Sequence, residues 1–234
     1  MKRYAAIVLS AGSGSRMKSQ IPKQYMELKG YPVIYYSLKA FEESRVDDII
    51  LVAGESDIEY CRKEIIEKYH IKKVKAVVPG GRERYDSVYN GIKAAENADY
   101  VLIHDGARPM LSNEIIERAM NCVSRCGACV VGMPVKDTIK IVDSNRKATA
   151  TPDRDSLWQI QTPQCFERNL IMTSYARLYQ DIEMHKEVPA ITDDAMVVEY
   201  GSGQDIELVE GSYTNIKITT PEDIRIAELF ITCS

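Results

Sequence analysis

Short apolar runs alternate with amphipathic stretches along most of the chain, and this rhythm constrains the fold more than any other feature. Runs typical of buried strands cover residues 4–10, 48–54, 73–79, 100–106 and 128–134. Helical patterns lie between or after them, near 33–44, 56–69, 83–96, 112–125 and 167–180, with a last helix from Thr220. This alternation predicts an α/β fold with a mostly parallel sheet and helices on both faces.

The rhythm changes after Met133. Apolar and polar residues alternate from about 136 to 160 around the turn DSNRK, a pattern typical of a β-hairpin. A hairpin of this length is marginally stable alone, so we expect a protruding arm that packs on another subunit. Without repeats or a clear linker, residues 1–234 are expected to form one Rossmann-like domain that carries this arm.

Composition and charge narrow the class of partner. A formal net charge of −4 argues against a nucleic-acid binder, although local cationic clusters can still bind small anions. No apolar run approaches the roughly 20 residues that span a bilayer, so no membrane partner is expected. The N-terminal apolar run is shorter than the roughly 7–15 residues of a signal sequence, which leaves a cytoplasmic location as the expectation.

Cys122, Cys126 and Cys129 are spaced C-x3-C-x2-C, which permits two interpretations. The spacing resembles the cluster-binding motif of radical S-adenosylmethionine enzymes, in which thiolates hold an iron–sulfur cluster. Alternatively, these are reduced core cysteines. The second interpretation is favoured, because the first two lie on a helical pattern that leads into a buried strand.

The stretch LSAGSGSRMKSQIPKQY, residues 9–25, places two glycines at the end of the first strand. It lacks the third glycine of a dinucleotide fingerprint, where Met17 stands, and it lacks the G-K-[ST] of a Walker A loop. Glycines let backbone N–H groups approach a phosphate, and Arg16 and Lys23 add positive charge. A triphosphate site is therefore predicted, with a solvated surface turn as the alternative.

Four other stretches place polar residues where a strand ends or a helix begins: 79–91, 104–109, 192–195 and 212–223. Ligands of open α/β sheets bind at the carboxyl ends of strands. Asp105 is a candidate ligand for a hard divalent cation and Arg108 for a phosphate, while His104 is interpreted as a packed side chain. Ser87 either contacts a base or caps a helix. Lys217 lies in an apolar context, where a lysine usually has a specific role or occupies an edge strand.

Together, SAGSGSRM, IPKQY, GGRERYDSVYNG, HDGARP, KDTIK, TPDR, QTPQCF, TDDA and NIKITTPED resemble the 2-C-methyl-D-erythritol 4-phosphate cytidylyltransferase family. The resemblance covers essentially the whole chain in order. Ribitol 5-phosphate cytidylyltransferases share much of this set, but HDGARP is more similar to the first family. Ser10 and Gly106 stand where that family often has alanine, which affects loop geometry more than chemistry.

The resemblance implies transfer of a cytidylyl group from CTP to methylerythritol 4-phosphate with release of pyrophosphate, assisted by Mg²⁺ or another divalent cation. It assigns catalysis to Arg16, Lys23 and Lys217, and the metal to Asp105. It places CTP against Ala11, Gly12, Gly14, Arg16, Lys23, Gly81, Ser87 and Gly106. It places the acceptor against Asp105, Arg108, Thr138, Arg154, Thr162, Thr192 and Lys217.

The same resemblance makes the arm the contact of a homodimer, with Arg154 reaching the neighbouring active site. Two other functions remain open from the residues: the same chemistry on ribitol 5-phosphate, and a non-catalytic nucleotide sensor. Small-molecule substrates are expected under each of them.

Overall fold

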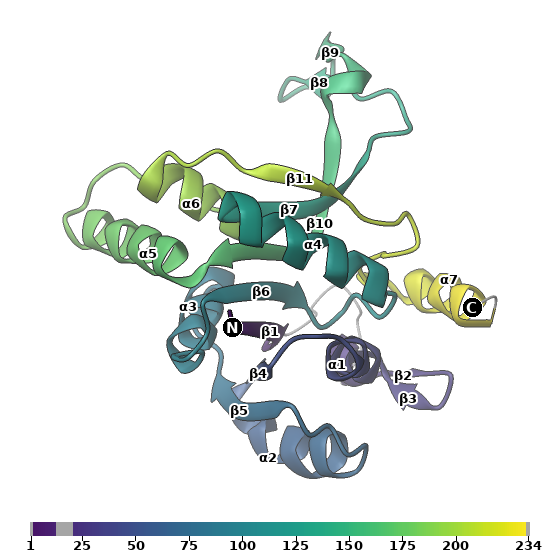
Figure 1. The fold of residues 1–234 in the computed structure, drawn as a ribbon. Coiled ribbons are helices and arrows are strands. Elements are labelled where there is room, and N and C mark those ends of the chain that lie inside the picture. The colour runs from purple at the N-terminus through teal and green to yellow at the C-terminus, as the bar shows by residue number, and fades with distance from the viewer. Residues whose placement is uncertain (1, 13–20, 233–234) are drawn as a thin grey trace.

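A central sheet organises the computed structural model, which describes residues 2–12 and 21–232 (Figure 1). Within these residues the sheet has seven strands in the order β11-β7-β10-β6-β1-β4-β5. Their bounds are β1 Tyr4–Ser10, β4 Asp48–Ala53, β5 Val74–Pro79, β6 Tyr100–Asp105, β7 Ala128–Pro134, β10 Trp158–Glu167 and β11 Glu207–Glu210. Neighbouring strands pair in parallel except at β10, which is antiparallel to β6 and β7. The predicted mostly parallel sheet is confirmed.

Helices cover both faces of this sheet, as predicted. One face packs against α1 Val33–Glu43, α2 Ile58–Tyr60 with the π-helical segment Cys61–Glu67, and α4 Asn113–Cys126. The other face packs against α3 Arg84–Ala94, α5 Arg168–Glu183 and α6 Asp194–Ser202. Side chains alternate along each strand, so Ala6 and Val8 belong to the first core while Ala5 and Ile7 belong to the second.

A smaller core joins the last helix, α7 Pro221–Thr232, to the short strands β2 Glu27–Leu28 and β3 Tyr31–Pro32. The Asp223 carboxylate accepts hydrogen bonds from the backbone N–H groups of Thr219 and Thr220, both at 2.8 Å, and so caps α7. This core matters for the site because Ile218, which belongs to it, directly follows Lys217 in the chain.

Ser56 and Glu59 match the S-x-x-E pattern that predicts a capping box, but this prediction is wrong. A 3-10 turn, Glu55–Asp57, precedes α2, and the Ser56 hydroxyl bonds the Asp57 carboxylate at 3.3 Å instead of a helix N–H group. A capping box occurs one helix later, at α3, between Glu83 and Asp86.

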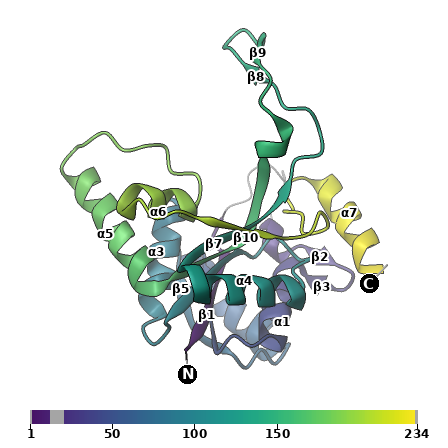
Figure 2. The same ribbon diagram turned by 45° about the horizontal axis from the view of Figure 1, so that its top comes forward.

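The predicted arm projects away from the sheet (Figures 1 and 2). Its antiparallel strands are β8 Ile141–Val142 and β9 Ala148–Ala150, followed by a 3-10 turn, Arg154–Ser156. Every residue from 136 to 151 is exposed. Residues 158–160, which the prediction included in the arm, form the start of β10 and pair with β7. A dimer contact at the arm stays a prediction.

No helix in the described part of the chain is both long and apolar enough to span a membrane.

Candidate active site

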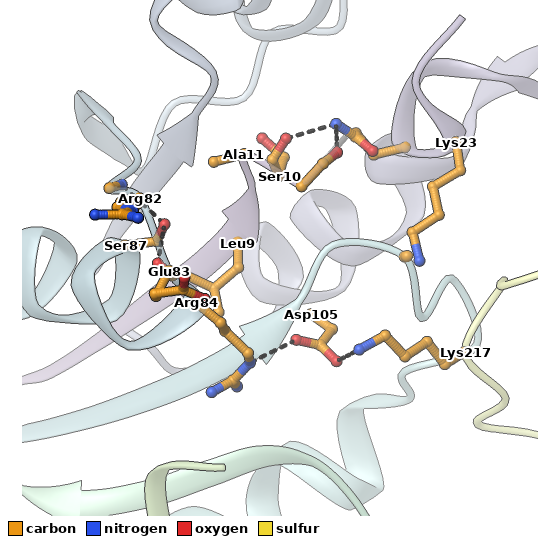
Figure 3. Close-up of a pocket in the computed structure, with 14 residues that line it drawn as sticks. Leu9, Ser10, Ala11, Lys23, Arg82, Glu83, Arg84, Ser87, Asp105 and Lys217 are labelled. Carbon is orange, nitrogen blue, oxygen red and sulfur yellow. Dashed lines mark hydrogen bonds and ion pairs between the residues drawn. The ribbon is translucent and has the colours of Figure 1, made fainter. Parts of the chain in front are cut away.

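A cavity of about 420 Å³ opens at the carboxyl ends of the central strands (Figure 3). The chain passes from β1 to β4 on one side and returns through β6 on the other side of β1. Such a reversal of strand order is where open α/β sheets bind ligands. Of the predicted site residues, the cavity is lined by Ala11, Gly12, Lys23, Gly81, Ser87, Asp105 and Lys217.

Asp105, at the end of β6, is the centre of charge in this cavity. The Lys217 ammonium lies 2.6 Å from its carboxylate, the Arg84 guanidinium 3.7 Å and the Arg108 guanidinium 4.0 Å. Asp105 is only 8% exposed. Burial alone would raise the pKa of this carboxyl, but Arg84 and Lys217 outweigh burial and hold the pKa below its usual range. Positive charge therefore exceeds negative charge around Asp105, which suits a polyanionic ligand.

Arg84, at the first turn of α3, is a site residue that sequence reasoning missed. Its guanidinium bonds the fully buried Asp194 carboxylate at 2.8 Å and also faces Asp105. Tyr175 donates a second hydrogen bond to Asp194 at 3.0 Å. The available signal was the position of Arg84 three residues after a strand-end glycine pair, inside a stretch that the sequence had already marked.

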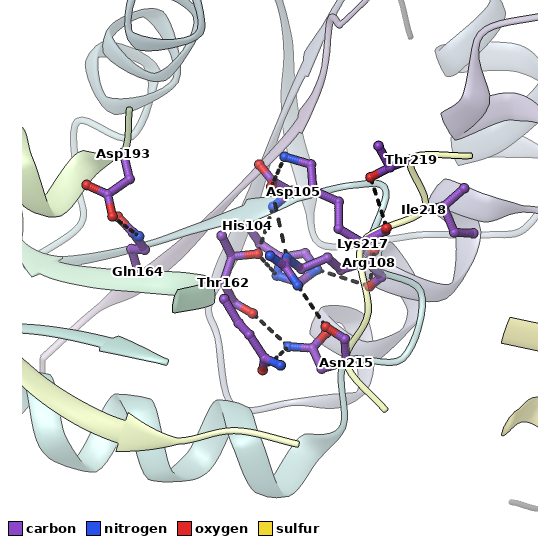
Figure 4. Close-up of polar contacts among 12 residues, drawn as sticks. His104, Asp105, Arg108, Thr162, Gln164, Asp193, Asn215, Lys217, Ile218 and Thr219 are labelled. Carbon is purple, nitrogen blue, oxygen red and sulfur yellow. Dashed lines mark hydrogen bonds and ion pairs between the residues drawn. The ribbon is translucent and has the colours of Figure 1, made fainter. Parts of the chain in front are cut away.

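His104, Thr162 and Arg108 form a second layer behind Asp105 (Figure 4). The Thr162 hydroxyl accepts a hydrogen bond from the Asp105 N–H at 3.1 Å and contacts His104 Nδ1 at 3.0 Å. The Arg108 carbonyl, 3.3 Å from Nε2, can only accept a hydrogen bond, so Nε2 carries the ring proton and Nδ1 accepts from the Thr162 hydroxyl. Burial lowers the pKa of His104 to about 4, consistent with a neutral, packed ring.

Arg108 turns away from the main cavity and lines a neighbouring one of about 310 Å³. Its Nη1 donates to the Asn215 carbonyl at 2.8 Å (Figure 4). The Asn215 amide in turn donates to the Thr162 carbonyl at 3.0 Å. Lys217 lines both cavities, so the two lie on either side of this lysine.

Two loops shape the opposite wall of the main cavity. Ser87 accepts a hydrogen bond from the Gly81 N–H at 3.0 Å and donates to the Glu83 carbonyl at 3.2 Å, so it joins the glycine loop to α3, while Glu83 is the residue that caps the helix. Gln24, which the sequence did not single out, donates to the carbonyls of Ser10 at 2.6 Å and Gly12 at 3.2 Å. These bonds hold the start of the glycine loop against the first strand.

Close packing explains two of the predicted glycines. A Cβ at Gly81 would lie 2.2 Å from the Asp86 Cβ, so only glycine fits between the loop and α3. A Cβ at Gly106 would lie 2.9 Å from the Leu9 carbonyl oxygen, so an alanine would require the backbone of β1 to shift. The Gly106 N–H donates to this same carbonyl at 2.9 Å.

Thr138, Arg154 and Thr192 do not line the main cavity. Thr138 and Arg154 are exposed on the arm, and Arg154 donates to the Lys136 carbonyl at 3.3 Å. Thr192 is exposed just before α6, where Asp193 forms the N-cap. Gly14 and Arg16 lie outside the described residues. Lys23 lines the cavity, and its ammonium donates to the Ile218 carbonyl at 2.9 Å.

The donor set at Asp105 fits a magnesium ion that arrives with phosphates. Magnesium in such sites is bound by one or two carboxylates together with substrate phosphates and water. Glu83 also lines the cavity, but its side chain caps α3, which leaves the Asp105 carboxylate as the donor. Among the described residues, no cluster of three histidine or carboxylate ligands forms a complete protein cage here.

Comparison with known proteins agrees with this geometry. The family model described as IspD, 2-C-methyl-D-erythritol 4-phosphate cytidylyltransferase, matches residues 4–233. A protein of that name from Lachnospira eligens is 52% identical over 227 residues, covering 97% of this chain and 98% of its own. Another from Lachnoclostridium phytofermentans is 49% identical, covering 99% and 97%. The solved structure of 4-diphosphocytidyl-2C-methyl-D-erythritol synthase from Anaerococcus prevotii matches with a TM-score of 0.84 at 34% identity, covering 99% and 96%. The chain therefore belongs to the IspD family of cytidylyltransferases.

Proposed function

We propose that this enzyme transfers a cytidylyl group from CTP to 2-C-methyl-D-erythritol 4-phosphate, giving CDP-methylerythritol and pyrophosphate. The observation that carries the proposal is the cluster of Arg84, Arg108 and Lys217 around one buried carboxylate, Asp105. This excess of cations lies at the edge of the sheet where nucleotides bind, in a member of this family.

The reaction needs positioning and charge neutralisation more than it needs a base. A phosphate oxygen of the acceptor attacks the α-phosphorus of CTP and forms a new P–O bond, while the bond to the β-phosphate oxygen breaks and pyrophosphate leaves. Because the nucleophile is already an anion, no proton has to be abstracted. Fixed cations around the reacting phosphates then supply most of the rate enhancement.

Lys23 and Lys217 approach the cavity from distant segments, which suits them to hold the triphosphate from two sides (Figure 3). We assign the same role to Arg16. Backbone groups of Ala11, Gly12 and Gly81 form the wall against which CTP would lie. Magnesium, bound to Asp105 and phosphate oxygens, would neutralise further charge on the triphosphate.

The acceptor is assigned to the second cavity, on the other side of Lys217. This cavity is lined by Arg108 and Lys217. Two cationic side chains favour a phosphate ligand. Thr162 is assigned an indirect role in the site: its buried hydroxyl accepts a hydrogen bond from the Asp105 N–H and so positions Asp105.

An assay of pyrophosphate release with CTP and two acceptors in parallel tests the function. Rapid turnover with methylerythritol 4-phosphate and slow turnover with ribitol 5-phosphate is the expected result. The opposite ranking would reassign the acceptor, and binding of CTP without turnover on either acceptor would indicate a nucleotide sensor. The Lys23→Ala variant serves as the inactive control for background hydrolysis.

We also infer that residues 1–234 act as one nucleotidyltransferase domain and form a homodimer in the cytoplasm. One sheet takes strands from both halves of the chain, which supports a single domain. The exposed side chains of Ile141 and Val142 support a protein contact at the arm. CTP and small phosphorylated polyols are the substrates of this reaction, which supports a cytoplasmic location. The reaction requires no nucleic acid.

A further inference from the structure

Three cysteines meet where α4 runs into β7, at the edge of the sheet opposite the active site. Cys122 and Cys126 lie on the last turn of α4, Gly127 turns the chain with a φ of 81°, and Cys129 is the second residue of β7. The ligand atoms of these cysteines all lie within 4.8 Å of one another. The active-site cavity lies at the carboxyl ends of the strands, whereas Cys129 lies near the amino end of its strand.

The spacing of the sulfur atoms suits a single metal ion. Cys122 and Cys126 are four residues apart on one helical face, and their Sγ atoms are 3.7 Å apart. Around a tetrahedral zinc ion with Zn–S bonds of about 2.3 Å, neighbouring sulfur atoms are about 3.8 Å apart. An iron–sulfur cluster is larger and holds its cysteines farther from one another, so the observed spacing favours one ion.

The surroundings of the cluster add features that a metal site needs. Cys129 is fully buried, but Cys126 is partly exposed, which leaves a path for an ion to enter. The C-terminal end of a helix carries partial negative charge, which favours a cation. Glu207, the first residue of β11, lies directly beside Cys129 in the strand register, and its carboxylate is ion-paired with Arg125, which contacts Cys122 Sγ at 3.8 Å. An ion at the thiols would take this carboxylate over from Arg125.

We propose that Cys122, Cys126 and Cys129 form a structural site for a thiophilic divalent cation of the zinc type. A Glu207 oxygen or a water molecule completes its coordination. The ion joins the end of α4 to the start of β7. As it binds, three metal–sulfur bonds form and the three thiol protons pass to solvent.

Two of the three thiols donate hydrogen bonds to backbone carbonyls. Cys126 Sγ donates to the Ala128 carbonyl at 3.2 Å, and Cys129 Sγ donates to the Ala119 carbonyl at 3.6 Å. Because the ion must displace thiol protons, metal affinity is expected to rise with pH.

Titration of the purified full-length chain with Zn²⁺ and with Co²⁺ as a spectroscopic probe tests the site. All variants carry Cys233→Ser, which removes the cysteine outside the described residues. We expect one tightly bound equivalent, sulfur-to-Co²⁺ charge-transfer bands with intense tetrahedral d–d bands, and a melting temperature that rises with Zn²⁺. Proton release that accompanies binding is measured in the same titration.

Cys126→Ser is the decisive variant, because this partly exposed position tolerates serine without disturbing the core. It is expected to weaken Zn²⁺ binding by more than about 100-fold, since loss of an outer-shell partner alone costs roughly 10–100-fold. Cys61→Ser is the matched control: this buried thiol bonds the Tyr25 hydroxyl at 3.2 Å and lies outside the group. It should bind Zn²⁺ and Co²⁺ as the parent does.

Three outcomes would overturn the proposal. The first is weak binding to the parent chain, with no thermal stabilisation. The second is a Co²⁺ spectrum that survives Cys126→Ser unchanged. The third is a coloured protein that contains iron and does not exchange it for Zn²⁺, which would restore the iron–sulfur interpretation.

Discussion

The active-site edge of the sheet and the projecting arm are built in opposite ways. At the edge, charged groups are buried and paired, with the Asp105 carboxylate 2.6 Å from the Lys217 ammonium and also close to two arginines. On the arm, strands of two and three residues carry exposed side chains from 136 to 151. The charged side chains at the edge are positioned within a single chain, because the ends of its parallel strands fix the backbone to which they are attached. The arm lacks a core of its own, so its order depends on whatever it contacts.

This contrast predicts different consequences for mutation. A change at the active-site edge should alter chemistry or pH dependence in every molecule, whatever the protein concentration. A change on the arm should matter only when a partner is bound, and its effect should therefore depend on concentration.

The largest effect is expected for Lys23→Ala. Removing one preorganised charge from the reacting phosphates should lower kcat by about 10²–10³-fold, by analogy with loss of an oxyanion donor. The melting temperature should change little. Steady-state pyrophosphate release measures the first quantity and calorimetry the second, with the exposed Lys72→Ala as control. Near-normal turnover in Lys23→Ala would remove this lysine from the catalytic site.

Acid should destabilise the edge through His104. Its folded pKa of about 4 lies below the ordinary 6.5, so the unfolded chain takes up this proton first. Above pH 6.5, neutral His104 contributes about 3 kcal/mol to the free energy of unfolding. This contribution is lost as the pH falls towards 4. Urea unfolding at several pH values measures it.

The His104→Gln variant should flatten this part of the stability profile. If that variant does not fold, NMR titration of the ring in the native protein replaces it. Parallel profiles for the two proteins, or a ring that protonates near pH 6.5, would contradict a buried neutral histidine.

On the arm, Ile141→Ser tests whether the exposed apolar residues contact a second copy. Burying one isoleucine is worth about 1.5–3 kcal/mol, so the dimer dissociation constant should rise at least about tenfold. Sedimentation across a concentration series measures this. Lys147→Ser, at the exposed turn of the arm, is the control. Unchanged association would show that the arm is not the dimer contact.

The smallest effect is expected for Arg154→Ala. Loss of one charged contact to the acceptor phosphate should lower kcat/KM for the acceptor by about tenfold, with little change in stability. Mixing this variant with Lys23→Ala under conditions of subunit exchange gives a sharper test. If Arg154 serves the neighbouring site, a mixed dimer has one intact site and activity returns. Without recovery, Arg154 acts within its own chain or not at all.

Much of the fold could be predicted because local patterns were strong. The runs at 4–10 and 128–134 became β1 and β7 with unchanged bounds, since each is a continuous apolar segment between polar residues. Among the described residues, β10 and β11 of the central sheet were missed, as were the short strands β2 and β3. β10 combines an exposed start with a buried polar segment, including Gln161 and Gln164, and β11 has only four residues at the edge of the sheet. Neither strand shows a regular alternation of apolar and polar residues, because its side chains are buried by the neighbouring strands.

The candidate site divides in the same way. Lys23, Asp105 and Lys217 could be singled out because glycines and charges at strand ends are informative by themselves. Lys217 was expected in a strand, yet the segment Lys217–Thr219 has no regular structure. Arg84 could not be assigned, because its role depends on Asp194, which is 110 residues away in the sequence.

By itself, the sequence determined the class of fold and the residue types available for the chemistry, because these follow from local period and charge, and it predicted a phosphate site at residues 9–25. Only the tertiary structure decided which charges meet. It placed Lys217 on Asp105, set Arg84 between two buried carboxylates and directed the Thr162 hydroxyl inward to His104. Such pairings depend on which strand ends become neighbours when the sheet forms, and no local pattern encodes that order.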